Sequence, residues 1–367
     1  MPLRCETGQI GQDLRAAERV RQAVVGDVEN SGIPTLTLCP ARCHATSPLR
    51  PGSIAYGLSV AGVSRIRLAI RNMDEGKGSR LEHRADPVAG NVDRATVEGF
   101  GQEWAAYDQS ALVGVEYGKL FDGYFRIFPF DELPNNAEGF DLGCGSGRWA
   151  AGVAPRVGLL HCIDPSEAAL KVARRQLCDH HNVRFHNAAA DSIPLADDSQ
   201  DFGYSLGVLH HVPHSARALA DCVIKLKPGA PFLLYLYYAL DHRPTWFRAL
   251  WRVTDLARRA IAPMPFAVRN AATSLIAGLV YWPLARIAWF GERLGANVSA
   301  MPLSAYRYRS FYSMRTDALD RFGTRLERRF TREEIEQMMR EAGLIDIRFS
   351  EEEPYWVACG RRAMKSS

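Results

Sequence analysis

The sequence predicts an α/β fold built on a doubly wound, mostly parallel sheet of seven strands. From residue 137 onward, short apolar runs alternate with helical segments, which is the pattern of βαβ units around a parallel sheet. The first of these runs leads into the segment Phe140-Asp-Leu-Gly-Cys-Gly-Ser-Gly147. Its three alternating glycines predict a strand-to-helix turn whose backbone approaches a ligand closely, because glycine has no side chain.

The other elements follow in chain order. The expected strands are 137–140, 159–163, 183–186, 202–209, 231–238, 345–349 and 355–359. The expected helices are 166–178, 215–226 and 331–343. Ser166 is placed to cap the first of these helices, and Thr331-Arg-Glu-Glu334 forms a capping box for the last. The last two strands are short enough to pair as an antiparallel hairpin.

Composition narrows the class of protein. A chain of 367 residues is long enough for one large domain with additions, or for two domains. Its 47% hydrophobic and 23% charged residues are ordinary for a globular protein, and a net charge of +4 does not indicate a nucleic-acid partner. Eight cysteines lack framework spacing, and no apolar N-terminal stretch resembles a signal peptide, so we expect a cytoplasmic protein.

The N-terminal segment differs from the rest of the chain. It is broken by Gly, Pro and Ser and lacks sustained periodicity, which predicts a poorly structured extension. Met73 opens a segment that reads as a start, so we hypothesise that residues 1–72 are absent from the working protein. Cys39, Cys43 and His44 lack the second ligand pair that zinc sites need, and no metal is expected. The expected division is 1–95 extension, 96–240 core, 241–314 helical insertion and 315–367 C-terminal part of the core.

Two acidic residues follow the next strands of the predicted sheet. Asp164 lies 164 − 147 = 17 positions beyond Gly147, where a carboxylate can accept hydrogen bonds from ribose hydroxyls. Asp191 follows the third strand, in Ala190-Asp-Ser-Ile-Pro194. NAD sites use a similar acid, but their third glycine comes one position later to admit a pyrophosphate. The spacing here therefore argues against a dinucleotide.

Three further blocks follow in the chain: Asp198-Ser-Gln-Asp-Phe202, Ser205-Leu-Gly-Val-Leu-His-His211 and Leu226-Lys-Pro-Gly229. Together with the glycine-rich turn and the two acids, they closely resemble class I methyltransferases, specifically the small-molecule enzymes with a type 11-like domain. The resemblance covers roughly residues 98–240 and 315–362. It implies a Rossmann-like methyltransferase fold and S-adenosylmethionine (SAM) as cofactor. The cofactor-binding residues that it implies are Asp141, Gly143, Cys144, Gly145, Gly147, Asp164, Pro165, Asp191, Ser192 and Leu206.

The resemblance assigns Asp164 to the ribose, Asp191 to the adenine amino group, and Asp141 to the turn amides or the SAM amino group. Structural alternatives stay open for each. The glycines fit any tight turn, Asp164 can cap a helix, and Asp191 can form an Asx-turn. Cys144 is expected to be a small buried side chain beside the cofactor rather than a nucleophile.

His210 and His211 are the catalytic candidates, because they follow the fourth strand at the mouth of the predicted cofactor site. Methyl transfer from SAM needs mainly alignment and exclusion of water, and a base only if the acceptor is a hydroxyl or an acidic carbon. Imidazole titrates near neutrality and can supply that base. The alternative is a pair that orients the loop or touches the cofactor. Upstream, Trp104 and Tyr107 are either lid residues or members of a helical core stripe.

The insertion has the most individual composition. Residues 241–300 hold four of the seven tryptophans, and eight arginines against three acids give 8 − 3 = +5 without a lysine. A stretch at 271–285 is apolar but too short and Pro-interrupted for a confident membrane span. Three alternatives stay open: a lid over an apolar acceptor, an interfacial element that docks on a membrane, and a structural hairpin or dimer interface. Apolar residues recur at helical spacing at Trp246, Leu250, Val253, Ala257 and Ile261.

We therefore expect a SAM-dependent methyltransferase that acts on a small lipophilic acceptor, such as a quinone, polyketide, terpenoid or lipid-linked compound. The alternative acceptor is a sugar or another polar metabolite. The alternative of another class is a non-catalytic SAM-fold subunit that binds or regulates. The expected partner is the acceptor, without nucleic acid, and the docking alternative adds contact with the inner face of a membrane.

Overall fold

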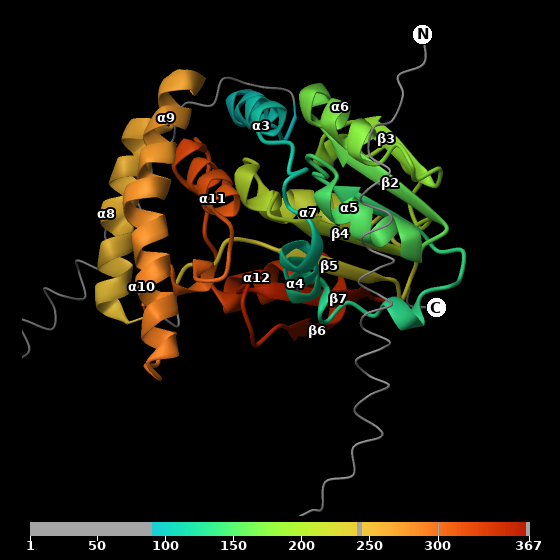
Figure 1. The fold of residues 1–367 in the computed structure, drawn as a ribbon. Helices are drawn as coiled ribbons and strands as arrows, with labels where there is room; N and C mark the ends of the chain where they lie inside the picture. The colour runs from blue at the N-terminus through green and yellow to red at the C-terminus, as the bar shows by residue number, and fades with distance from the viewer. Residues whose placement is uncertain (1–89, 241–243, 300, 365–367) are drawn as a thin grey trace, which may run out of the picture. The chain divides into compact units, whose positions relative to one another are not determined.

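The computed structural model describes residues 90–240, 244–299 and 301–364, so the hypotheses on residues 1–72 and on the Cys39–His44 segment lie outside the described residues. The sheet has the strand order β3-β2-β1-β4-β5-β7-β6 (Figure 1). β7 is antiparallel to both of its neighbours, and the other pairs are parallel. The strands are β1 Glu138–Leu142, β2 Leu159–Asp164, β3 Val183–Asn187, β4 Phe202–Leu206, β5 Pro231–Tyr235, β6 Leu344–Phe349 and β7 Val357–Arg362.

Helices cover both faces of this sheet. On one face, Trp149 and Leu170 belong to a core shared with β2 and β4; on the other, Leu219 and Ile335 pack with β1 and β5. The predicted doubly wound α/β fold with an antiparallel C-terminal hairpin is thus confirmed. The helices outside the insertion are α3 Arg94–Ala106, α4 Gly114–Phe125, α5 Arg148–Val153, α6 Glu167–Gln176, α7 Ser215–Val223, α11 Phe311–Gly323 and α12 Arg332–Glu341.

Local sequence signals fix several element ends. The Ser166 hydroxyl accepts the N–H of Ala169 at 3.3 Å and starts α6. The capping box before α12 is present, since the Thr331 hydroxyl accepts the Glu334 N–H at 3.2 Å and the Glu334 carboxylate accepts the Thr331 N–H at 2.8 Å. The prediction that the fourth strand runs to residue 209 is wrong. It ends before Gly207, whose φ of 78° leaves the extended region.

The insertion forms a layer of helices beside the sheet, with α11 between them and the core (Figure 1). α9 Phe266–Ile276, a π-helical turn Ala277–Tyr281 and α10 Trp282–Arg293 form one continuous helix, preceded by α8 Thr245–Ile261. This helix of 28 residues is long and apolar enough to cross a membrane by length and composition. The expectation of a proline interruption is wrong, because the wider π turn lies just before Pro283 and accommodates its missing N–H.

Candidate functional site

The glycine-rich turn joins β1 to α5 in a conformation that requires glycine. Gly143 and Gly145 have φ values of 77° and 54°. A Cβ on Gly143 would lie 2.4 Å from the methyl carbons of Val208, and one on Gly145 would lie 3.0 Å from the indole nitrogen of Trp104. Side chains at these two positions would therefore be strained by the backbone; the one at Gly143 would clash with Val208, and the one at Gly145 would press on Trp104. The turn leaves its backbone bare toward a cavity.

The cavity has a volume of about 470 Å³ and extends from this turn to the inner side of the insertion. Its first part is lined by residues 143–146, by residues 164–166 at the end of β2 and by residues 206–208 at the end of β4. The carboxyl ends of neighbouring parallel strands meet there, which is where α/β sheets bind ligands. The predicted residues that line it are Gly143, Cys144, Gly145, Asp164, Pro165, Leu206 and His211.

Asp164 holds the turn and still faces the cavity. Its Oδ2 accepts the N–H of Gly145 at 3.0 Å, and its Oδ1 accepts the N–H of Ser166 at 2.8 Å. Burial raises the pKa of Asp164 to about 6. A carboxylate has about four acceptor positions, so two backbone bonds leave room for ribose hydroxyls. The capping contact is therefore present, and it does not preclude the predicted contact with a cofactor.

The remaining predicted cofactor residues lie away from the cavity wall. Asp141 is buried behind the turn beside Tyr204, its Oδ2 has no hydrogen-bond partner among the described residues, and burial raises its pKa to about 8. Asp191 accepts the N–H of Asn91, whose side chain is itself bonded to the backbone of His214. The structure does not bring Asp191 to the cavity. The cavity lining also omits Gly147 and Ser192.

The two candidate histidines have different surroundings. His210 is fully buried, stacks on Tyr237 with ring centroids 3.9 Å apart, and does not line the cavity. Burial lowers its pKa well below the usual range, so the ring is neutral. His211 lines the cavity, and its Nδ1 lies 2.7 Å from the carbonyl oxygen of Leu326. A carbonyl only accepts, so Nδ1 carries a proton and donates it to this oxygen.

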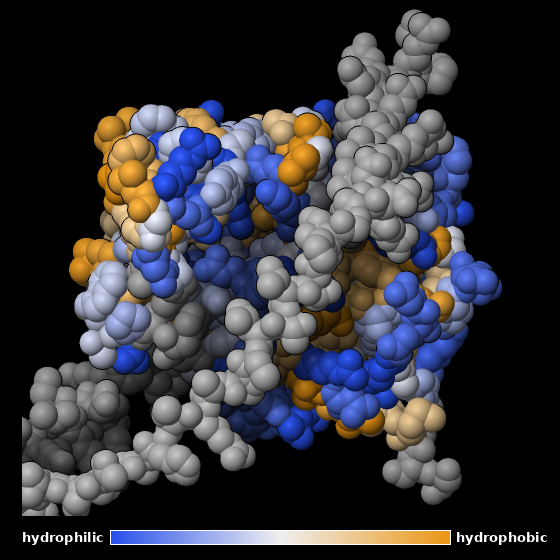
Figure 2. Space-filling model, turned by 60° about the horizontal axis from the view of Figure 1, so that its bottom comes forward, coloured by the Kyte–Doolittle hydropathy of each residue, from blue (hydrophilic) through white to orange (hydrophobic). Residues whose placement is uncertain are grey.

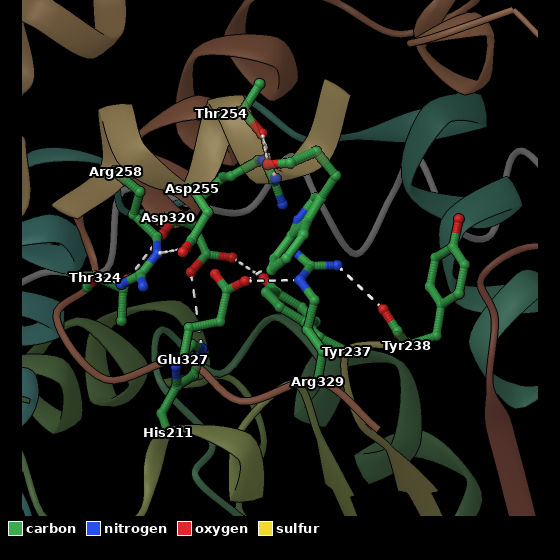
Figure 3. A network of polar contacts seen from close by, with 12 residues as sticks. His211, Tyr237, Tyr238, Thr254, Asp255, Arg258, Asp320, Thr324, Glu327 and Arg329 are labelled. Carbon is green, nitrogen blue, oxygen red and sulfur yellow. Dashed lines mark hydrogen bonds and ion pairs between the residues drawn. The ribbon is translucent and has the colours of Figure 1, made fainter. Parts of the chain in front are cut away.

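Nε2 of His211 faces a carboxylate from a distant part of the chain. It lies 3.9 Å from Oδ1 of Asp320 on α11, and neither atom has a hydrogen-bond partner among the described residues. The hydroxyl of Tyr237 donates to the other oxygen of Asp320 (Figure 3). A separation of 3.9 Å is too long for a direct hydrogen bond, and both atoms are buried. A hydroxyl has one proton and can donate it to only one of two acceptors. The pair therefore sets a carboxyl group beside an imidazole at the cavity wall.

Around this pair, the part of the cavity under the insertion is lined by tyrosines and charged groups. Arg329 donates to Glu327 at 2.8 Å and to the carbonyl of Tyr238 at 3.2 Å, which fixes the segment after α11 against β5 (Figure 3). Burial and the nearby Asp320 raise the pKa of Glu103 well above its usual value. The lining residues that sequence reasoning did not identify as site residues include Glu103, Tyr124, Tyr237, Arg309, Asp320 and Arg321.

The helix α3 covers both parts of the cavity. The Trp104 indole lies over Gly145, and Phe100, one turn earlier, packs on His211 with ring centroids 4.9 Å apart. Tyr107 instead is buried and donates to the side chain of Asn270 at 2.6 Å. Of the two alternatives for this helix, Trp104 thus has the position of a lid residue and Tyr107 that of a core residue.

These residues fit SAM as the ligand of the first part of the cavity. A bare glycine turn can receive the methionine portion, and Asp164 can receive the ribose. The large Trp104 ring is placed to cover them. Nothing in this donor set calls for a metal, and no cluster of His, Cys, Asp and Glu suited to a metal occurs among the described residues.

Comparison with known proteins agrees with this assignment. Residues 140–234 match the family model described as a methyltransferase domain. A ubiquinone biosynthesis O-methyltransferase of Aromatoleum aromaticum is 28% identical over 172 residues, 43% of this chain and 73% of that protein. The corresponding protein of Alkalilimnicola ehrlichii is 35% identical over 91 residues, 24% of this chain and 37% of that protein. The chain thus spans well under two thirds of the latter relative's length.

Among solved structures, a SAM-dependent methyltransferase of Methanosarcina mazei aligns with 17% identity and a TM-score of 0.40, over 64% of this chain and 96% of that one. The family match confirms the family predicted from the glycine-rich turn, and with it SAM as the cofactor.

Proposed function

We propose that this chain, which carries a class I SAM-dependent methyltransferase domain, transfers the methyl group of SAM to a hydroxyl oxygen of a small lipophilic acceptor. The observation that carries the proposal is the hydrogen bond of His211. Its Nδ1 is committed to the Leu326 carbonyl, so Nε2, which faces Asp320 at the cavity wall, is the nitrogen that would act as the base. A hydroxyl acceptor needs such a base, whereas a neutral amine acceptor does not need one before it attacks.

Each residue around the cavity has its own role in the proposed reaction. When bound, SAM supplies an activated methyl group, which passes to the acceptor oxygen as the carbon–sulfur bond breaks and leaves its electron pair on sulfur. Nε2 of His211 takes the proton of the acceptor hydroxyl. Asp320 lies close enough to stabilise the resulting imidazolium, and Tyr237 holds that carboxylate in place. Phe100 and Trp104 on α3 exclude water from both reactants.

An aromatic hydroxyl compound is the acceptor that fits this lining best. Tyr124 and Tyr235 on the sheet side, and Tyr281 and Tyr306 on the insertion side, all border the cavity. Rings stack on such walls, and the polar tips of tyrosine hydrogen-bond to ring substituents. The two relatives named above are O-methyltransferases of ubiquinone biosynthesis, which supports an acceptor of this kind. We therefore include phenolic quinone precursors and phenolic polyketides among the proposed acceptors.

A polar acceptor is the second candidate, and it has its own supporting observation. Arg321 borders the cavity, donates to the Thr254 hydroxyl at 2.9 Å, and has no carboxylate partner among the described residues. Such a group is suited to an anionic substituent. A sugar acid or another acidic metabolite would use it in the same site.

The test uses the full chain, methyl-labelled SAM and an extract of whole cells, followed by partition between organic and aqueous phases. Label in the organic phase supports the lipophilic acceptor, and label in the aqueous phase supports the polar one. The His211→Asn variant is run beside His210→Phe, which keeps a ring against Tyr237. No label in either phase with the wild-type chain, despite SAM binding by calorimetry, would overturn the enzyme proposal and favour a non-catalytic subunit.

A further inference from the structure

The outer surface of the insertion is apolar where a soluble helix layer would be polar. On α8, the side chains of Asp255 and Arg258 turn inward and are only 12% and 11% exposed. Trp246, Leu250 and Leu256 point outward, and Leu256 is 66% exposed. On α8, Asp255 and Arg258 thus bond to the protein while large apolar residues face away, although Arg248 and Arg252 are also exposed.

The long helix of α9, the π turn and α10 is apolar on both sides: Ala277, Tyr281 and Ala285 are buried in a cluster with α11, and large apolar residues are also exposed. Arg269 and Thr273 are buried against α11, while Leu275 and Leu279 are 63% and 75% exposed. Only 28% of its most apolar 18-residue window is buried. Hydrophobic residues accordingly gather along the left edge of the space-filling view, over α8 to α10 (Figure 2). The exposed large apolar residues of these helices are Trp246, Leu250, Val253, Leu256, Val268, Leu275, Leu279, Val280, Trp282, Ile287 and Phe290. We call this set the outer apolar face.

The charges beside the outer apolar face are of one sign. Arg248 and Arg252 on α8 are exposed and have no carboxylate partner among the described residues. Within 244–299, Asp255 is paired with Arg258 and Arg259, and Glu292 is paired with Arg307. Both acids are therefore already neutralised by arginine. A surface that meets this face must itself be apolar and bordered by negative charge.

We propose that the outer apolar face docks on an anionic lipid bilayer, with α8 and the α9–α10 helix lying in the plane of the membrane surface. Apolar side chains at this density, with arginine and tryptophan at the edges, are typical of interfacial helices. Each exposed arginine would then meet a lipid phosphate.

A second copy of this chain fits the same face less well. A two-fold dimer would bring the outer apolar face against itself, and the arginines of one copy would meet those of the other without an exposed acid to pair them. A helix that spans the bilayer also fits poorly, because Arg269 and Thr273 would leave their bonds to the protein and enter lipid.

The docked orientation would also bring the acceptor site close to the membrane, a consequence that rests on the proposed function. Tyr281 lies on the inner side of the long helix and borders the cavity, while Leu279 and Trp282 beside it in sequence belong to the outer apolar face. The thickness of one helix thus separates the membrane surface from the acceptor site. A lipophilic acceptor dissolved in the bilayer would have a short path to the cavity.

The experiment sediments the full chain with vesicles of phosphatidylcholine alone, or of equal parts phosphatidylcholine and phosphatidylglycerol. Docking predicts binding to the anionic vesicles that weakens with salt. The double variant Leu279→Glu/Phe290→Glu should bind at least about tenfold more weakly. Arg248→Gln/Arg252→Gln should lose about fivefold for each arginine. Val115→Glu on α4 is the matched control, because Val115 is 74% exposed and lies outside the outer apolar face.

Three outcomes would overturn docking, and none depends on methyl transfer. The first is a wild-type chain that stays in the supernatant with anionic vesicles. The second is a wild-type chain that binds no vesicles and is a dimer by light scattering, while Leu279→Glu/Phe290→Glu is a monomer. That result would assign the outer apolar face to a second copy of the chain. The third is resistance of the membrane-bound chain to extraction at alkaline pH, which would show that the long helix spans the bilayer. Circular dichroism of each variant establishes that it is folded.

Discussion

The imidazole of His211 and the carboxylate of Asp320 face each other at 3.9 Å across the wall of the cavity. His211 lies in the turn after β4, and Asp320 lies on α11, beyond the whole insertion. The SAM-binding half of the fold therefore holds the proposed base, and the C-terminal half supplies the carboxyl group beside it. The proposed pair forms only when the segment after the insertion has packed on the sheet.

Replacing His211 separates chemistry from cofactor binding. In His211→Asn the proton acceptor is lost, so we expect kcat to fall by about 10² to 10⁴, the usual contribution of a general base. The Kd for SAM should stay within about twofold, because His211 does not belong to the turn that holds the cofactor. Steady-state rates and calorimetry measure the two quantities. The control His210→Phe should keep nearly full activity, and equal losses in the two variants would assign both rings to packing.

Replacing Asp320 should lower activity and raise stability together. Burial raises the pKa of this carboxyl, so its ionised form is held at a cost in the folded chain. In Asp320→Asn that cost disappears, and the Tyr237 hydroxyl can still donate a hydrogen bond to the side-chain oxygen. We therefore expect a higher midpoint of thermal unfolding at pH 8. The imidazolium loses its neighbouring charge, and kcat should fall about tenfold. A variant that is both less stable and less active would instead indicate a structural role.

Most of the fold was predictable because it depends on local signals. The alternation of apolar runs and helices, the Ser166 cap and the Thr331–Glu334 capping box each specify an element within a few residues, and the structure has them all. The end of β4 was not predicted, since the apolar residues after Gly207 continue the pattern of the strand. The positive φ of Gly207 ends the strand, although the residues that follow it are apolar.

The cofactor half of the site was predictable for the same reason, and the acceptor half was not. Glycine spacing and Asp164 form a short, continuous signal. Asp320 is one acid on an ordinary amphipathic helix, and nothing near it in sequence shows that it meets His211. The direction of the apolar stripe on α8 was equally hidden, because the helical period shows that two faces differ and does not show which one is buried. Asp191 follows the pattern of the family, yet its carboxylate is bonded to Asn91.

Replacing Asp164 tests whether it binds the cofactor as well as the turn. Loss of a charged acceptor for the ribose hydroxyls should weaken SAM binding by about 10- to 100-fold in Asp164→Asn, since hydrogen bonds to charged groups contribute about 1.5–3 kcal/mol. Thr331→Ala is the control. It removes the cap of α12 at a cost of about 1 kcal/mol in stability and should leave the Kd for SAM unchanged, because Thr331 does not line the cavity. An unaltered Kd in Asp164→Asn, measured by calorimetry, would leave the residue only its role in the turn.

The pH dependence of stability should change when Asp141 is replaced by asparagine. Burial raises the pKa of Asp141 to about 8 in the folded chain, against about 3.9 in an unfolded one. Between these values the folded state keeps a proton that the unfolded state has lost, so stability falls as pH rises, by up to about 1.4 kcal/mol for each pH unit. Asp141→Asn removes this contribution, so its stability relative to the wild type should improve by up to about 4 kcal/mol from pH 5 to pH 8. Urea unfolding of both proteins without SAM measures this difference in stability at each pH. The contribution of Asp164 to the pH dependence cancels in the difference, because both proteins contain Asp164. Parallel curves for the two proteins would mean that Asp141 is ionised throughout this range.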